Sequence, residues 1–285
     1  MKAEEISKLR ETHKLKPSDI TICTYPKCGT TLMQQVVLSL LADGDLSKVK
    51  DPMGMSKWAE ATVSRTGVAS FTDWQPDPTT QRKPPARRVV KTHAPVHLKP
   101  WAGDIPEHGK VIVITRNPAD AAVSMHNHAR DVPLFQYSGA WDHFFPSLFL
   151  PGLVESGCFW AWHAGWWEFY GQNIDRVLWL SYEDFKMDPR GTVTKVAKFI
   201  DCSASKACIE RTVDSSSFEN MRRNAEEVDK EKEAKGEFVK KNHIRKGLSG
   251  AWRKVFSKED EAKLMRTHQE KCEEYKMPQE LFNFM

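Results

Sequence analysis

A lysine, a glycine and two threonines near the start of the chain form a short pattern that suits an anion. They lie in the segment 24–31, TYPKCGTT, between an expected strand and an expected helix. Backbone N–H groups in a tight turn before a helix bind anions, and Gly29 would permit close approach. Thr30 and Thr31 would add hydroxyl donors, and Lys27 a positive charge. The pattern predicts a loop that holds the phosphate end of a nucleotide; an ordinary turn with a surface lysine is the alternative.

A lysine and a histidine, Lys91 and His93, stand two residues apart directly after a second expected strand. At a strand end they would place a cation and a titrating base beside the same pocket. Histidine is the side chain whose unperturbed pKa suits proton abstraction near neutral pH. Taken alone, His93 would more often be structural, so its significance depends on the neighbouring motifs.

Arg116 follows a third expected strand, and Ser124 lies in the helix after it. The carboxyl end of a strand is where open α/β sheets bind ligands, and a planar guanidinium matches a phosphate. A magnesium-dependent NTPase would usually carry a carboxylate there to hold the metal. The arginine therefore favours a phosphate contact, with a structural ion pair as the alternative.

A fourth basic motif, Arg245-Lys246-Gly247, follows a stretch of mixed charge. Two cations and a glycine would suit closure over a second phosphate, although a solvated basic patch is the more common case. We expect the charged stretch, about 225–243, to be a mobile loop that becomes ordered on nucleotide binding.

The elements that must position these residues alternate between strands and helices. This order predicts a single α/β domain over residues 1–285, with a central, mostly parallel sheet flanked by helices and a P-loop-like strand–loop–helix. The expected strands are 20–24, 88–92, 110–115 and 177–181. The expected helices are 30–41, 118–129, 160–170, 192–200, 205–213, 218–223 and 257–275.

Composition sets the cellular context. The net charge of +4 is too small for a nucleic-acid-binding signature, and the six cysteines have no paired zinc spacing. There is no apolar run of about 18 residues and no secretory leader, so neither a membrane span nor secretion is expected. These features predict a cytoplasmic protein without nucleic-acid or membrane partners.

The four motifs, in their order and chemistry, resemble the cytosolic sulfotransferase family from about residue 20 to 256. The resemblance implies in-line transfer of a sulfuryl group from 3′-phosphoadenosine 5′-phosphosulfate (PAPS) to a hydroxyl or amine of a small-molecule acceptor. The product nucleotide would be 3′-phosphoadenosine 5′-phosphate (PAP), and no metal would be needed.

The same resemblance implies roles for individual residues. His93 would be the general base, Lys27 and Lys91 would stabilise developing charge, and Ser124 would contact the 3′-phosphate and Lys27. The implied nucleotide contacts are Lys27, Cys28, Gly29, Thr30, Thr31, Leu32, Arg116, Ser124, Tyr182, Ser216, Phe218, Met221, Arg245, Lys246 and Gly247. The implied acceptor contacts are Trp58, His93 and His128.

Several positions depart from the family pattern. Cys28 replaces a common serine, Leu32 a tryptophan that stacks near the adenine, and Ala94 a leucine. Ala94 would leave more space near the acceptor, and His128 stands where several phenol-sulfating members have an aromatic residue; together they favour a bulky or polar acceptor. Lys258 falls at the centre of the family's dimer motif, so dimerisation by that route is disfavoured and the oligomeric state stays open.

Two other interpretations and one side hypothesis remain. A P-loop nucleotide kinase would need a G-K-[ST] step and a magnesium carboxylate, which are not found at the right places. A non-catalytic nucleotide-binding protein would be favoured by loss of Lys27, Lys91 or His93, and all three are present. Cys28, near Lys27 and a helix N-terminus, is either a reactive thiol of lowered pKa or a buried inert one.

Overall fold

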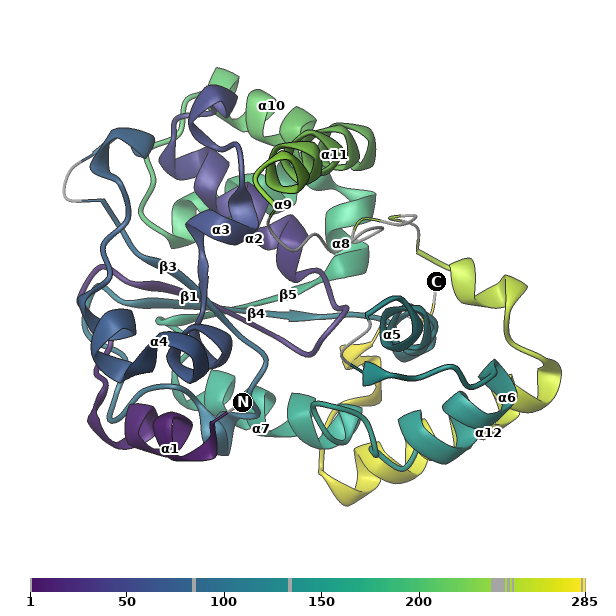
Figure 1. Cartoon of the computed structure of the whole chain (residues 1–285). Helices are drawn as coiled ribbons and strands as arrows, with labels where there is room; N and C mark the ends of the chain where they lie inside the picture. Colours follow the sequence, from purple (N-terminus) through teal and green to yellow (C-terminus); the bar gives the residue numbers. More distant parts are fainter. Residues whose placement is uncertain are drawn as a thin grey trace.

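Five parallel strands form the centre of the molecule, which we describe from a computed structural model (Figure 1). The structure describes residues 2–83, 86–132, 135–236, 244, 247, 249–282 and 284. The strand order is β2-β3-β1-β4-β5, and every neighbouring pair is parallel. The strands are β1 (Ile20–Thr24), β2 (Lys57–Trp58), β3 (Val89–Thr92), β4 (Lys110–Thr115) and β5 (Val177–Ser181). The predicted α/β fold with one central parallel sheet is confirmed.

Both faces of the sheet are buried. Since successive side chains of a strand point to opposite faces, neighbouring residues pack into different cores. In β4, Val111 and Val113 belong to one core cluster, whereas Ile112 and Ile114 belong to another. Figure 1 shows helices above and below the sheet. One layer contains α2 (Thr30–Leu41), α9 (Pro189–Phe199) and α10 (Lys206–Ser215). The other contains α7 (Phe159–Gln172) and α12 (Lys258–Glu274).

The remaining helices surround these layers. They are α1 (Ala3–Thr12), α3 (Pro52–Met55), α4 (Ala59–Asp73), α5 (Pro118–Asp131), α6 (Trp141–Phe144), α8 (Tyr182–Met187) and α11 (Phe218–Ala234). Single 3₁₀ or π turns occur at Leu46–Lys48, Pro78–Thr80, Val96–Leu98, Phe145–Phe149, Ala251–Lys254 and Gln279–Leu281. Within the described ranges, no helix is both long and apolar enough to span a membrane.

The charged stretch differs from its prediction. A loop was expected over about 225–243, but α11 continues to its end at Ala234. One side chain of this polar helix is anchored, since the Lys232 ammonium lies 2.7 Å from the carboxylate of Asp51. The loop prediction is therefore wrong for the helical residues, because mixed charge along an exposed helix was interpreted as disorder. Residues 237–243 lie outside the described part of the chain.

Candidate active site

A cavity of about 240 Å³ opens at the carboxyl ends of the strands, where open parallel sheets bind ligands. Every described candidate from the sequence lines it except Cys28. These residues are Lys27, Gly29, Thr30, Thr31, Leu32, Trp58, Lys91, His93, Arg116, Ser124, His128, Tyr182, Ser216, Phe218, Met221 and Gly247. The other two candidates, Arg245 and Lys246, lie outside the described residues.

The anion-binding loop joins β1 to α2 through two left-handed backbone positions. Lys27 has φ +72° and Gly29 has φ +111°. Gly29 is the N-cap of α2, so it leaves the first amides of the helix without a capping side chain. A Cβ on Gly29 would also lie only 3.0 Å from the Tyr182 ring. The glycine thus allows the uncapped end of α2 to face the cavity, as an anion site requires.

The thiol of Cys28 points away from the cavity into the core. Its side chain is fully buried among the residues beneath the sheet. Burial raises the pKa of the thiol well above its usual value, more than Arg116 and Lys27 lower it. The hypothesis of a reactive, low-pKa thiol is therefore wrong, and the inert interpretation holds. Cys28 can contribute to an anion site only through its backbone.

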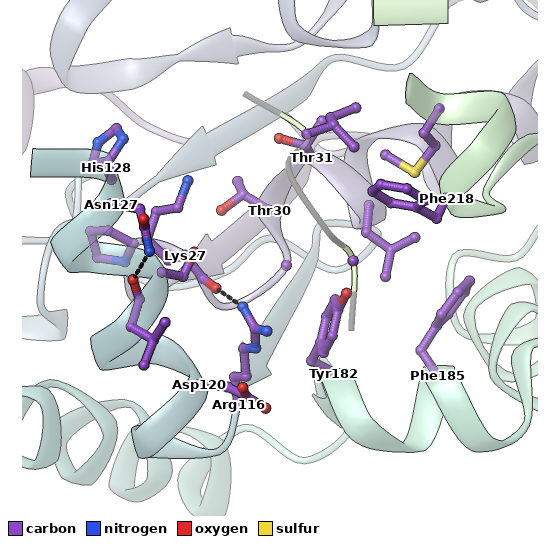
Figure 2. Close-up of a pocket in the computed structure, with 18 of the residues that line it drawn as sticks. Lys27, Thr30, Thr31, Arg116, Asp120, Asn127, His128, Tyr182, Phe185 and Phe218 are labelled. Atoms are coloured by element: carbon purple, nitrogen blue, oxygen red, sulfur yellow. Dashed lines mark hydrogen bonds between the residues drawn. The ribbon is translucent and has the colours of Figure 1, made fainter. Parts of the chain in front are cut away.

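Arg116 connects three segments at the strand ends. Its Nη1 donates a hydrogen bond to the carbonyl oxygen of Lys27 at 3.0 Å, and its guanidinium carbon lies 4.5 Å from the centre of the Tyr182 ring. Figure 2 shows the first of these contacts as the dashed line between Lys27 and Arg116. The arginine is therefore held against the anion-binding loop by a hydrogen bond and a cation–π contact.

The ring of His93 is oriented by β1. Its Nδ1 lies 2.9 Å from the carbonyl oxygen of Thr24, which can only accept a hydrogen bond. Nδ1 therefore carries the proton of the neutral ring, and Nε2 is the basic nitrogen. Thr24 also bonds through its hydroxyl to Thr30 at 2.6 Å. One strand end thus orients both the histidine and the first hydroxyl of α2.

The backbone around His93 is held by a carboxylate that the sequence motifs did not assign. Oε1 of Glu60, at the start of α4, accepts hydrogen bonds from the hydroxyl of Thr92 and the amides of His93 (3.2 Å) and Ala94 (3.0 Å). Burial raises the pKa of Glu60 above its usual range. Glu60 lies two residues after the predicted acceptor contact Trp58, but its hydrogen-bond partners could not be predicted from that position in the sequence.

Two indoles hold the opposite side of the same turn. Nε1 of Trp162 donates to the carbonyl oxygen of His93 at 2.9 Å, and Nε1 of Trp166 donates to that of Ala94 at 3.1 Å. Both tryptophans lie on α7; the sequence predicted this helix but not its contacts with the His93 turn. The turn that carries the histidine is therefore fixed by side chains from two helices.

One end of the cavity is largely apolar. Figure 2 shows Phe218, Phe185 and Tyr182 there, with Lys27 and Thr30 toward the middle. Leu32 and Met221 add further apolar side chains to the cavity lining. The Oγ atom of Ser216 in the cavity wall is buried and has no hydrogen-bond partner among the described residues. An apolar slot with an unsatisfied hydroxyl fits a nucleotide base, which has a flat face and polar edges.

Gly247, the described residue of the fourth basic motif, lies at this apolar end. Its φ is +59°, and a Cβ added there would lie 2.5 Å from the ring of Phe218. A few residues later the chain is held by Asp120 on α5. Its carboxylate accepts hydrogen bonds from the amides of Gly250 (2.6 Å) and Trp252 (3.1 Å). Asp120 was not predicted from the sequence, because its partners are more than a hundred residues away.

The other end of the cavity is polar and partly acidic. In Figure 2, His128 and Asn127 lie at this end, away from the aromatic slot. Asp131 and Glu155 line the same cavity, and the Nε2 of His128 is 3.8 Å from Oε1 of Glu155. Of these residues only His128 was predicted. Among the described residues there is no group of three or more His, Cys, Asp or Glu side chains placed to hold a metal ion.

Comparisons with known proteins agree with this geometry. The family model described as "Sulfotransferase domain" matches residues 17–276. Sulfotransferase 1 family member D1 of Rattus norvegicus is 30% identical over 277 residues, covering 95% of this chain and 89% of the relative. Sulfotransferase 1B1 of Mus musculus is 30% identical over 251 residues, covering 87% of this chain and 80% of the relative.

Solved structures share the fold. Mouse sulfotransferase SULT7A1 complexed with PAP aligns with a TM-score of 0.71 at 23% identity, covering 95% of this chain and 90% of that one. Retinol dehydratase in complex with androsterone and PAP aligns with a TM-score of 0.72 at 21% identity, covering 94% and 85%. With the family match over nearly the whole chain, this protein belongs to the sulfotransferase family and is a PAPS-dependent sulfotransferase.

Proposed function

We propose that His93 is the general base of this sulfotransferase and that the acceptor is a small polar molecule with a hydroxyl or amine. The observation that carries the proposal is the bond between Nδ1 of His93 and the Thr24 carbonyl oxygen. It leaves Nε2 as the basic nitrogen of a ring that lines the same cavity as Lys27 and Lys91. Nε2 would take the acceptor's proton as its oxygen or nitrogen bonds to sulfur and the bond from sulfur to the phosphate oxygen breaks.

Cations and amides beside His93 would stabilise the charge that moves during this transfer. Lys27 would face the leaving phosphate oxygen and Lys91 the sulfuryl oxygens, with the first amides of α2 binding the same anion. Bound PAPS supplies the sulfuryl group. Arg116 and Ser124, with Arg245-Lys246-Gly247, would hold its 3′-phosphate. The adenine base of PAPS would lie in the apolar slot, against Leu32, Tyr182, Ser216, Phe218 and Met221.

The acceptor would enter at the polar end of the cavity, past Trp58. Retinol dehydratase binds androsterone, and by analogy a small molecule would occupy this end here. Asp131, Glu155 and His128 line it, and two carboxylates favour hydrogen-bond donors or a positive charge on the acceptor. The lining therefore supports a polar acceptor over an apolar sterol.

Matched acceptors would test this proposal. Turnover of labelled PAPS would be measured with tyramine, 4-ethylphenol, 4-hydroxyphenylacetate and androsterone. We expect the highest kcat/KM for tyramine, since it shares the reacting phenol with 4-ethylphenol and differs in its cationic tail. Equal values for these two phenols, or a preference for androsterone, would contradict a polar acceptor site. Sulfation of none of them would direct the search to aliphatic alcohols and other amines.

We also propose that the protein works in the cytoplasm. All six cysteines are free, which suits a reducing compartment. Fractionation of cells that produce the chain, with detection by antibody, would test this; recovery in the secreted fraction would contradict it.

A further inference from the structure

The shortest strand of the sheet brings a tryptophan beside the lysine of the site. β2 contains only Lys57 and Trp58, and it pairs with β3 so that Trp58 lies opposite Lys91. Neighbouring residues in paired strands have side chains on the same face of the sheet. The Nζ atom of Lys91 accordingly lies 4.8 Å from the centre of the Trp58 ring, within the range of a cation–π contact.

The same indole also meets the histidine. The rings of Trp58 and His93 are 5.4 Å apart at an interplanar angle of 75°, an edge-to-face arrangement. The backbone of Trp58 is restrained on both sides, because this residue is both the end of β2 and the N-cap of α4. Glu60, two residues later, binds the amide of His93. The segment from Trp58 to Glu60 therefore contacts the side chains and the backbone of the Lys91–His93 pair.

We propose that Trp58 is a positioning residue for the ammonium of Lys91, in addition to any contact it makes with the acceptor. Lysine has a long side chain with many rotamers, so a charge meant for the sulfuryl oxygens must be restrained. An indole face attracts the cation without neutralising it, unlike a carboxylate partner. This inference rests on the proposed role of Lys91 and concerns how that charge is held.

The chain contains a matched control on the same strand. Lys57, which precedes Trp58 in β2, has its Nζ 5.6 Å from the centre of the Trp74 ring. Lys57 and Trp74 are absent from the lining of the cavity. Trp74→Leu would remove a cation–π contact of the same kind without touching the site, and should leave kcat unchanged.

A double-mutant cycle would test the proposal. Single-turnover rates at saturating PAPS and tyramine, or the best acceptor found, would be measured for Trp58→Leu, Lys91→Ala and the double variant. Loss of a cation–π contact should lower the rate of Trp58→Leu about 5- to 30-fold. Trp58→Phe, which keeps a weaker aromatic face, should fall between. In the Lys91→Ala background, Trp58→Leu should cost less than twofold more, because the contact is already gone.

Affinity for PAP, measured by calorimetry, would verify that each variant folds and binds nucleotide. The inference fails if Trp58→Leu lowers the rate equally in both backgrounds, or if it raises only the KM of the acceptor. Either result would show that Trp58 acts independently of Lys91, through the acceptor or through the ring of His93. If instead Lys91→Ala leaves the rate unchanged, the proposed role of Lys91 is wrong and this inference falls with it, while the assignment of His93 as base still stands.

Discussion

The two ends of the cavity are built in different ways. The end to which we assign the donor extends from Lys27 to Phe218. It is formed by the β1–α2 loop, the end of β4 and the starts of α8 and α11. Backbone amides and cations dominate this end, whereas the acceptor end is lined by side chains from the edge strand β2, the end of α5 and the segment before α7. We therefore expect donor binding to depend on the central strand–loop–helix elements, and acceptor choice on the peripheral side chains.

The largest expected effect lies where the two ends meet. His93→Ala should reduce the single-turnover rate by about 10²- to 10⁴-fold, because positioned proton transfer contributes that much. PAP affinity by calorimetry should change little, since the histidine faces the acceptor. His97→Ala, an exposed histidine on the same segment, is the control and should retain full activity. A near-normal rate for His93→Ala would remove the general base from the proposal.

Arg116→Ala should affect only the donor end. A charge-assisted bidentate contact to a phosphate would be lost, and PAP affinity should fall about 10- to 100-fold in calorimetry. Arg116→Lys should recover part of the affinity, since it keeps the charge but not the planar fork. Arg130→Ala, an exposed arginine on α5, should bind PAP normally. If Arg116→Ala shifts the KM of the acceptor and not PAP affinity, the division into two ends is wrong.

Glu155→Gln should affect only the acceptor end, and more weakly. The carboxylate is partly exposed and lies near His128, so solvent screens its charge. We expect the ratio of kcat/KM for tyramine over 4-ethylphenol to fall about threefold to tenfold. PAP affinity should be unchanged. An unaltered ratio in both Glu155→Gln and Asp131→Asn would show that the acidic lining does not select the acceptor.

Two buried groups should make the stability of the protein, rather than its activity, depend on pH. Burial lowers the pKa of His163, on α7 among aromatic rings of the core, to about 3 from 6.5. Below pH 6.5 the unfolded chain binds more protons at this site, so stability falls as pH drops from 6.5 toward 3, by at most about 1.4 kcal/mol per pH unit. Burial raises the pKa of Glu183, near Arg116, to about 7 from 4.5. There the folded chain binds more protons, so stability is lost as pH rises from 4.5 to 7.

The two buried groups should therefore change stability with opposite signs on acidification. Urea unfolding of the parent, His163→Asn and Glu183→Gln at pH 5 and 7.5 would measure this. His163→Asn should lose less stability than the parent on acidification, and Glu183→Gln should lose more. Identical pH dependence in all three proteins would mean that neither group titrates differently on folding.

Prediction from sequence succeeded where local pattern and fold coincide. The bounds of β1, α2, β4 and β5 agree with the expected ranges, because a buried strand followed by a turn and an amphipathic helix is a local signal. It failed for α4, in which Gly67 has a non-helical φ of +83° that interrupts the pattern. Local signals do not report partners that folding alone brings together.

The missed side chains show the same limit. Glu60 binds residues more than thirty positions away, and Asp120 binds amides at 250 and 252. Glu155 joins the cavity only through the path of the chain between the turn Phe145–Phe149 and α7. No spacing along the chain encodes these contacts, so they required the three-dimensional structure.

At Lys27 the left-handed backbone conformation lowers stability, whereas the charged side chain serves the proposed reaction. A φ of +72° suits glycine, and for another L-residue this region costs about 1–2 kcal/mol. Selection for thermal stability alone would therefore favour glycine at position 27, which would relax the loop and remove its positive charge. The lysine is consistent with selection for the reaction, and stabilising substitutions sought in this protein should leave this strained position untouched.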